Sequence, residues 1–179
     1  MRSEIVELVP RTQAPPSADR VLTTVMFTDI VGSTQRAAEL GDARWRELLA
    51  RHDTLVRAEL ERHGGREVKT LGDGFMARFD CPGQGIRCAR AIDAALEPLP
   101  FEVRVGLNTG ECDLVGDDLV GLAVNIAARI GALARAREVL VPSSVRDLVV
   151  GSGITFRDRG RHRIKGVPGR WRLFGVEAV

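Results

Sequence analysis

Two aspartates occupy positions that suit metal chemistry. Asp29 lies near the end of an apolar, β-branched segment, residues 21–30, and Asp73 has a glycine on each side in residues 72–74. If the two turns are adjacent, the carboxylates can bind two divalent cations, and hard oxygen ligands suit Mg²⁺ or Mn²⁺. Two such cations promote in-line displacement at phosphorus. Taken alone, each aspartate is more often an ordinary turn residue.

The backbone that follows Asp29 has the character of a phosphate-binding turn. It leads into a predicted helix, and N–H groups at a helix N-terminus bind anionic oxygens. We therefore expect phosphate contacts from five consecutive residues: Ile30, Val31, Gly32, Ser33 and Thr34. Ser33 and Thr34 are also good N-caps, which predicts that the helix starts at Gln35.

Three polar residues further along the chain have helical spacing. Asn125 is seven positions after Asp118, and Arg129 is eleven positions after it, so a helix over 119–134 would place all three along one face. Asn and Arg are costly to bury in an apolar helix unless they have partners. The spacing therefore favours a binding site. A polar stripe that faces solvent remains the alternative, because other positions already supply a core face.

Lysine is scarce in this chain. Of 26 basic residues only Lys69 and Lys165 are lysines, so arginine serves wherever a surface charge is sufficient. An ammonium group is a compact point charge, whereas a guanidinium is a planar fork, and the two are not interchangeable at a shaped site. Both lysines could still be ordinary surface residues. Lys69 lies just before the Gly72-Asp73-Gly74 turn.

The elements that must position these residues alternate between strands and helices. Two short strands around Asp73 read as a hairpin. The core order predicts an α+β fold: a ferredoxin-like βαββαβ antiparallel sheet with helices on one face, plus a C-terminal β-hairpin. The expected strands are 21–30, 67–71, 74–79, 101–108, 139–141, 161–165 and 171–176, and the expected helices are 35–40, 42–63, 86–96, 119–134 and one from 143 or 144.

Composition narrows the class of protein. A length of 179 residues fits one domain, which we expect over 20–179, after a Pro-rich arm or linker over 1–19. A net charge of +2 does not suggest nucleic-acid binding. No apolar run approaches membrane-spanning length, and three cysteines without ligand spacing read as reduced thiols, so we expect a cytoplasmic protein. We expect His52 and His63 at the surface, and the alternating arginines of 157–163 on a solvated strand face.

Four motifs together resemble a known family. They are residues 27–34, residues 69–74, residues 118–121 with Asn125 and Arg129, and Lys165-Gly166. In this order and spacing they resemble the class III nucleotidyl cyclase catalytic domain, in a bacterial subtype similar to actinobacterial cyclases. The resemblance runs from about Arg20 to Val176.

The resemblance implies a role for each motif. Metal ligands would be Asp29, Ile30 and Asp73, which implies two divalent cations, Mg²⁺ or Mn²⁺. Lys69 and Asp118 would select the base, Asn125 and Arg129 would orient the ribose and stabilise the transition state, and Lys165 would hold the terminal phosphates. The family site forms between two protomers, so the resemblance implies a homodimer with two shared sites.

Hydrogen-bond chemistry favours ATP as the substrate. Adenine offers an amino donor at N6 and an acceptor at N1, which match an acceptor-only Asp118 and a donor-only Lys69, whereas guanine presents the reverse pattern. We therefore expect an adenylate cyclase. A guanylate or relaxed-specificity cyclase, or a catalytically silent nucleotide-binding dimerisation module, are the alternatives.

Two local features differ from many members of the resembled family. Glu111 stands where many of them carry an arginine, and residues 114–117 are short, like the reduced dimer arm of a bacterial subgroup. We interpret both as features of the subtype. The N-terminal arm would suit attachment to a regulatory domain in a longer chain.

Overall fold

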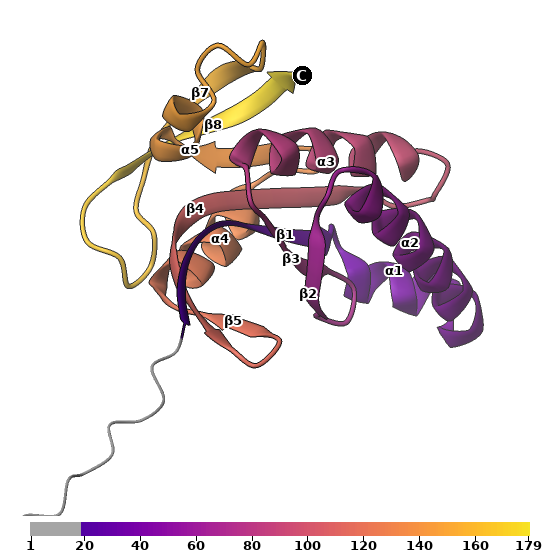
Figure 1. Cartoon of the computed structure of the whole chain (residues 1–179). Coiled ribbons are helices and arrows are strands. Elements are labelled where there is room, and N and C mark those ends of the chain that lie inside the picture. Colours follow the sequence, from indigo (N-terminus) through magenta and orange to yellow (C-terminus); the bar gives the residue numbers. More distant parts are fainter. Residues whose placement is uncertain (1–18) are drawn as a thin grey trace, which may run out of the picture.

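The computed structural model describes residues 19–179, so the linker expected over 1–19 lies outside the described residues except for Asp19, which already belongs to the first strand (Figure 1). The elements in chain order are β1 (Asp19–Ile30), α1 (Ser33–Leu40), α2 (Asp42–Arg62), β2 (Arg66–Thr70), β3 (Phe75–Phe79), α3 (Pro82–Ala95), β4 (Val103–Val115), β5 (Asp118–Val120), α4 (Leu122–Leu133), β6 (Val139–Pro142), α5 (Ser143–Leu148), β7 (Thr155–His162) and β8 (Trp171–Ala178).

A single eight-stranded sheet organises the molecule. Seven strands follow the order β2-β3-β1-β4-β6-β8-β7, and β5 pairs with β4 outside this path. The long central strand β1 pairs antiparallel with β3 on one side and with β4 on the other. The expected α+β class is confirmed. One detail differs, because β4 and β6 pair in parallel and the sheet is therefore mixed.

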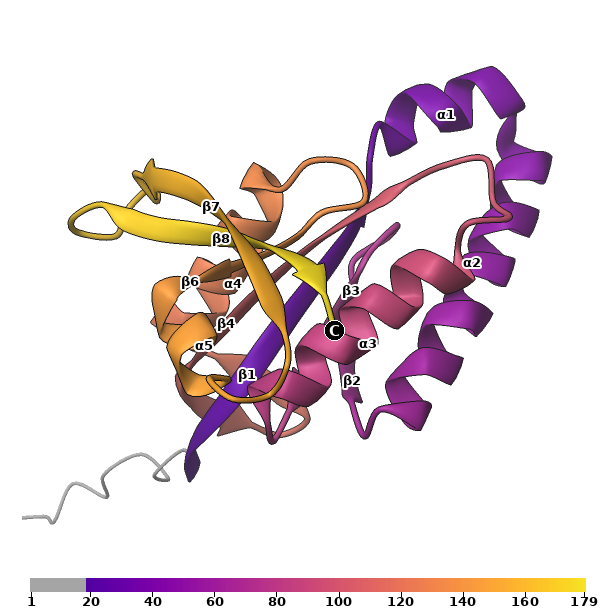
Figure 2. The same cartoon turned by 90° about the horizontal axis from the view of Figure 1, so that it is seen from above.

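Helices cover both faces of the sheet, not one face as the sequence suggested (Figures 1 and 2). Val25 and Met26 are consecutive on β1 and both are fully buried. Since neighbouring side chains of a strand point to opposite faces, both faces must be covered. Met26 packs in the core under α2 and α3, whereas Val25 packs with Ala123 and Ala127 of α4.

The segment before α4 forms a strand instead of the first turn of a helix. Gly116 has a φ of 61°, and the chain turns there so that Asp118–Val120 pairs antiparallel with the end of β4. The helix begins only at Leu122. The expectation that Asp118 shares a helix face with Asn125 is therefore wrong, because Asp118 lies on β5.

The first strand of the C-terminal hairpin has other bounds than expected. β7 ends at His162, so Lys165 lies in the connection between β7 and β8 and not within a strand. The arginines of β7 do not form a uniform solvated face. Arg159 is only 14% exposed in its side chain and its Nε donates to Glu138 Oε1 at 2.6 Å.

Two other expectations concern compartment and membrane. Cys88 and Cys112 are buried and Cys81 is exposed, and all three are free thiols. Burial raises the pKa of the Cys88 thiol to about 12. Within residues 19–179, no helix combines the length and apolar character needed to cross a bilayer.

Candidate active site

The two candidate metal ligands are brought together by a close contact between β1 and the β2–β3 hairpin. The Thr28 hydroxyl on β1 accepts a hydrogen bond from the backbone N–H of Phe75 at 3.0 Å. A Cβ placed on Gly74 would lie 2.1 Å from the Thr28 carbonyl oxygen, so only glycine allows this approach. Asp29 and Asp73 are the next residues outward on the two sides of this contact.

Asp29 borders a small cavity of about 210 Å³ between β1, the hairpin and α4. The lining residues are Phe27, Thr28, Asp29, Leu71, Gly74, Arg104, Ala128, Gly131 and Ala132. The short side chains on α4 leave this space open. The lining includes none of Lys69, Asp118, Asn125, Arg129 and Lys165.

Arg104 is a site residue that the sequence did not reveal. It is the direct cross-strand partner of Asp29 in the pairing of β1 with β4. Its Nε and Nη2 atoms both donate to Asp29 Oδ2, at 2.8 and 2.5 Å. The two residues are 75 positions apart in the sequence, with no local signal to link them, and only the register of the two strands would have found the pair.

The donor set fits a hard divalent cation. Asp29 and Asp73 offer only carboxylate oxygens, and residues 19–179 contain no group of three or more His, Cys, Asp or Glu side chains arranged for a metal. Oxygen-only sites of one or two carboxylates are typical of Mg²⁺ and Mn²⁺, which complete their coordination with water and substrate phosphates. The Ile30 backbone carbonyl is the further protein oxygen that the sequence resemblance assigns to this site.

The turn after β1 offers fewer free N–H groups than expected. The Val31 N–H donates to the Glu102 carbonyl at 2.8 Å, so this group already has an acceptor within the chain. The helix α1 begins at Ser33 and not at Gln35, because Gly32 takes the N-cap position with a φ of 68° and no side chain caps the helix. Ser33 and Thr34 lie in the first turn of α1, where N–H donors lack intrahelical partners. Phosphate binding by these N–H groups stays a prediction.

The two candidate base-selecting residues meet in a direct ion pair. Lys69 on β2 places its Nζ 2.8 and 2.7 Å from the two carboxylate oxygens of Asp118 on β5. Each side chain is 43% exposed. The Lys69 hydrogen bond, and secondly the Leu119 N–H, lower the pKa of Asp118, so the carboxylate is ionised at neutral pH.

The remaining three candidates lie around α4. Asn125 is exposed and Arg129 is partly buried on the same side of the helix, four residues apart. A Cβ on Gly166 would lie 2.9 Å from Arg129 Nη1, so the guanidinium rests against the loop that carries Lys165. Ile164 is 2% exposed and packs with Ile126 and Ile130 of α4, which anchors this loop.

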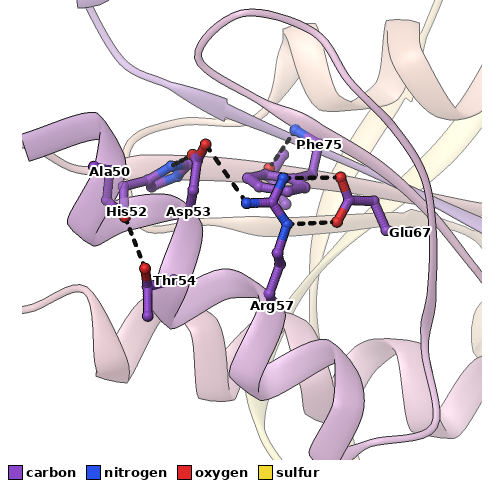
Figure 3. Close-up of polar contacts among 8 residues, drawn as sticks. Ala50, His52, Asp53, Thr54, Arg57, Glu67 and Phe75 are labelled. Carbon is purple, nitrogen blue, oxygen red and sulfur yellow. Dashed lines mark hydrogen bonds and ion pairs between the residues drawn. The ribbon is translucent and has the colours of Figure 1, made fainter. Parts of the chain in front are cut away.

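His52 is buried and is not a surface residue, which corrects the expectation from the sequence. Figure 3 shows it on α2 beside Asp53. Its side chain is fully buried on α2, with its ring centroid 5.7 Å from Phe75 and 5.9 Å from Phe101. Burial lowers the pKa of His52, and a hydrogen bond that Nδ1 donates to Asp53 Oδ1, at 3.0 Å, opposes this effect. Beside it, Arg57 of α2 pairs with Glu67 of β2, as Figure 3 shows.

Comparison with known proteins decides the family. Residues 16–178 match the family model described as the adenylate and guanylate cyclase catalytic domain. The chain belongs to this family. The cyclase domain is 30% identical over 163 residues to a relative from Rhizobium meliloti named as an adenylate cyclase, and 29% identical over 174 residues to a protein of Mycobacterium tuberculosis named "Adenylate cyclase". These alignments cover 86% and 85% of this chain, but only 28% and 39% of the relatives' own lengths.

Solved structures agree on the fold. The cyclase domain superposes with a TM-score of 0.77 on an adenylate/guanylate cyclase/hydrolase from Silicibacter pomeroyi, with 29% identity over 88% of this chain and 97% of that chain. It superposes with a TM-score of 0.79 on the adenylyl cyclase CyaB from Pseudomonas aeruginosa, with 24% identity over 89% of this chain and 95% of that chain. The mixed sheet with helices on both faces is thus the cyclase fold.

Proposed function

We propose that this cyclase domain is an adenylate cyclase that converts ATP to 3′,5′-cyclic AMP and pyrophosphate, with its active sites shared across a homodimer. The observation that carries the choice of ATP is the ion pair between Lys69 and Asp118.

The Lys69–Asp118 pair is complementary to adenine. The Lys69 ammonium donates to both oxygens of Asp118, and because it has three N–H donors, at least one remains for an acceptor such as adenine N1. The ionised carboxylate retains acceptor sites for the N6 amino group. Guanine would place its O6 acceptor near a carboxylate and its N1–H near an ammonium, and buried mismatches of this kind are the costly ones.

The remaining residues supply positioning and charge. Asp29 and Asp73 would hold the divalent cations, which polarise the 3′-hydroxyl and bind the triphosphate when present. Asn125 would orient the ribose for in-line attack of its 3′-oxygen on the α-phosphorus. Arg129 would balance the charge that develops at the α-phosphate. Lys165, on the loop that contacts Arg129, would balance the charge on the departing pyrophosphate.

Two features of the monomer support a shared site. Asn125 and Arg129 lie on a stripe of α4 that is bounded by two exposed leucines, Leu122 at 57% and Leu133 at 38% exposure. Exposed apolar side chains around a functional face are typical of a protein interface. Neither Asn125 nor Arg129 lines the cavity beside Asp29. The α4 helix of a partner subunit would therefore supply these two side chains to the site.

The first test measures the product. Purified protein is incubated with ATP or GTP and Mn²⁺ at several protein concentrations, and the nucleotides are identified by mass spectrometry. We expect cyclic AMP from ATP, a much slower reaction with GTP, and a specific activity that rises with protein concentration. Equal rates with both substrates would support a relaxed cyclase, and no product from a demonstrably dimeric protein would support the silent binding module.

The second test addresses the shared site. The variants Asp73→Asn and Arg129→Ala should each be inactive alone, because every site in each homodimer lacks one group. In an equal mixture, each mixed dimer has one intact site, so about one quarter of the wild-type activity should return if pairing is random. Absence of recovery after demonstrated subunit exchange would refute the shared site.

A further inference from the structure

The contact between Arg104 and Asp29 has a consequence for cation binding. Both Arg104 N–H donors converge on one carboxylate oxygen, Oδ2. Among residues 19–179, no hydrogen bond reaches the other oxygen, Oδ1. A carboxylate held in this way presents one free oxygen to a cation and has the second one already occupied by a positive charge.

Arg104 is itself held by a third element. Its Nη1 donates to the Ala132 carbonyl in the last turn of α4, at 3.2 Å. The last carbonyls of a helix lack intrahelical partners, so the guanidinium satisfies one of them. The same side chain thus links β4, β1 and α4. Arginine does not deprotonate in proteins, so this positive charge is permanent.

The ion pair between Arg104 and Asp29 is accessible enough for a metal ion to compete with the guanidinium for the carboxylate. The Arg104 side chain is 31% exposed and the Asp29 side chain is 41% exposed. Pairs this accessible to water contribute little stability, because water already solvates both charges well. A divalent cation carries twice the charge of the guanidinium and can approach a carboxylate oxygen more closely.

We propose that Arg104 is an internal counter-cation for Asp29, which lowers the affinity of the metal-free site for divalent cations by occupying Oδ2 and by repelling the incoming charge. This inference rests on the proposed metal-binding role of Asp29. Arg104 therefore sets the cation concentration at which the site fills in the absence of nucleotide. Arg104 acts on the cation through Asp29, the carboxylate that its guanidinium contacts.

The test is a direct titration of the whole chain with Mn²⁺ in the absence of nucleotide, followed by the electron paramagnetic resonance signal of free Mn²⁺. The variant Arg104→Gln removes the charge and frees Oδ2, so its dissociation constant should fall about tenfold, from the repulsion between +1 and +2 charges a few ångströms apart in water-like surroundings. Arg104→Lys keeps the charge and should stay within about threefold of wild type.

Two controls separate the possible failures. Arg20→Gln makes the same charge change at the other end of β1, where Arg20 contacts Glu111 and Asp113, and should leave Mn²⁺ affinity unchanged. Asp29→Asn should abolish the binding. If Asp29→Asn binds Mn²⁺ like the wild type, the metal role in the proposed function is wrong, and this inference is wrong with it. If Asp29→Asn loses binding but a folded Arg104→Gln binds no more tightly than wild type, only the role of Arg104 is refuted.

Discussion

Replacing Gly106 with alanine should push α4 away from the sheet. A Cβ at this position of β4 would lie 2.2 Å from the Gly131 nitrogen, 2.5 Å from the Gly131 Cα and 2.7 Å from the Ala127 carbonyl oxygen. All three are backbone atoms of α4 or its turns, so no side-chain rotation can relieve the contact. The helix must shift by about 1 Å, and a tightly packed interior resists such a shift.

The facing glycine provides a matched control. A Cβ on Gly131 would lie 3.3 Å from the Gly106 nitrogen and 3.6 Å from its Cα, so the backbone needs to move by only a few tenths of an ångström. Neither glycine has a positive φ, so backbone strain does not distinguish them. Alanine inside a helix is favoured over glycine by about 1 kcal/mol, which offsets the tighter contact at Gly131.

The expected magnitudes differ clearly. Overpacking of a core costs about 1–3 kcal/mol, and the rigid backbone neighbours place Gly106→Ala at about 3 kcal/mol or more. For a chain of this length each 1 kcal/mol lowers the melting temperature by about 2–4 °C, so Gly106→Ala should lose about 6–12 °C. Gly131→Ala should stay within about 1 kcal/mol of wild type.

Chemical denaturation and thermal melting measure both variants, and the cyclase assay measures the consequence for the site. Since α4 carries Asn125 and Arg129, Gly106→Ala should also reduce turnover in its folded fraction, whereas Gly131→Ala should retain most of it. Equal stability losses in the two variants would refute the argument that the close approach of α4 to β4 requires glycine at position 106.

Three further predictions concern the hairpin, the buried histidine and the base pocket. Thr28→Val leaves the Phe75 N–H without its acceptor and should lower the free energy of urea unfolding by about 1–3 kcal/mol. It should also reduce cyclase activity more than Thr23→Val, which is a buried change farther from Asp29. Equal activity losses in the two variants would contradict this. Burial lowers the pKa of His52 below its ordinary 6.5, so the unfolded chain takes up a proton at a higher pH than the native chain, and stability should fall as the pH drops below about 6.5. His52→Phe should weaken this pH dependence of stability between pH 7.5 and 5.5. An unchanged slope would show that His52 is not its source. Exchanging Lys69 and Asp118 keeps the ion pair but reverses donor and acceptor, so the ratio of kcat/KM for ATP to that for GTP should fall at least tenfold, and an unchanged ratio would remove the basis for choosing ATP.

Local patterns predicted most elements and failed where long-range pairing decided the outcome. The apolar, β-branched composition of residues 21–30 predicted β1, the Gly72-Asp73 turn predicted the hairpin, and apolar residues at helical spacing predicted α2. Each of these signals lies within one segment. The β5 residues were expected to start a helix, because their composition is only partly apolar and β-branched and gives no clear strand signal. Their strand conformation comes from pairing with β4. His52 was expected at the surface because its neighbours on α2 are polar, but Phe75 and Phe101 arrive from distant segments and bury it.

The sequence by itself determined the chemical groups of this cyclase domain: two carboxylates at turns, two rare lysines, and an asparagine and an arginine four residues apart. Types and spacing are properties of the chain, and together they indicated the family. Only the tertiary structure decided which groups meet. Strand register places Arg104 against Asp29, and the β5 turn brings Asp118 to Lys69, across 75 and 49 residues of chain. Such contacts depend on the pairing and packing of whole elements, which no local pattern encodes.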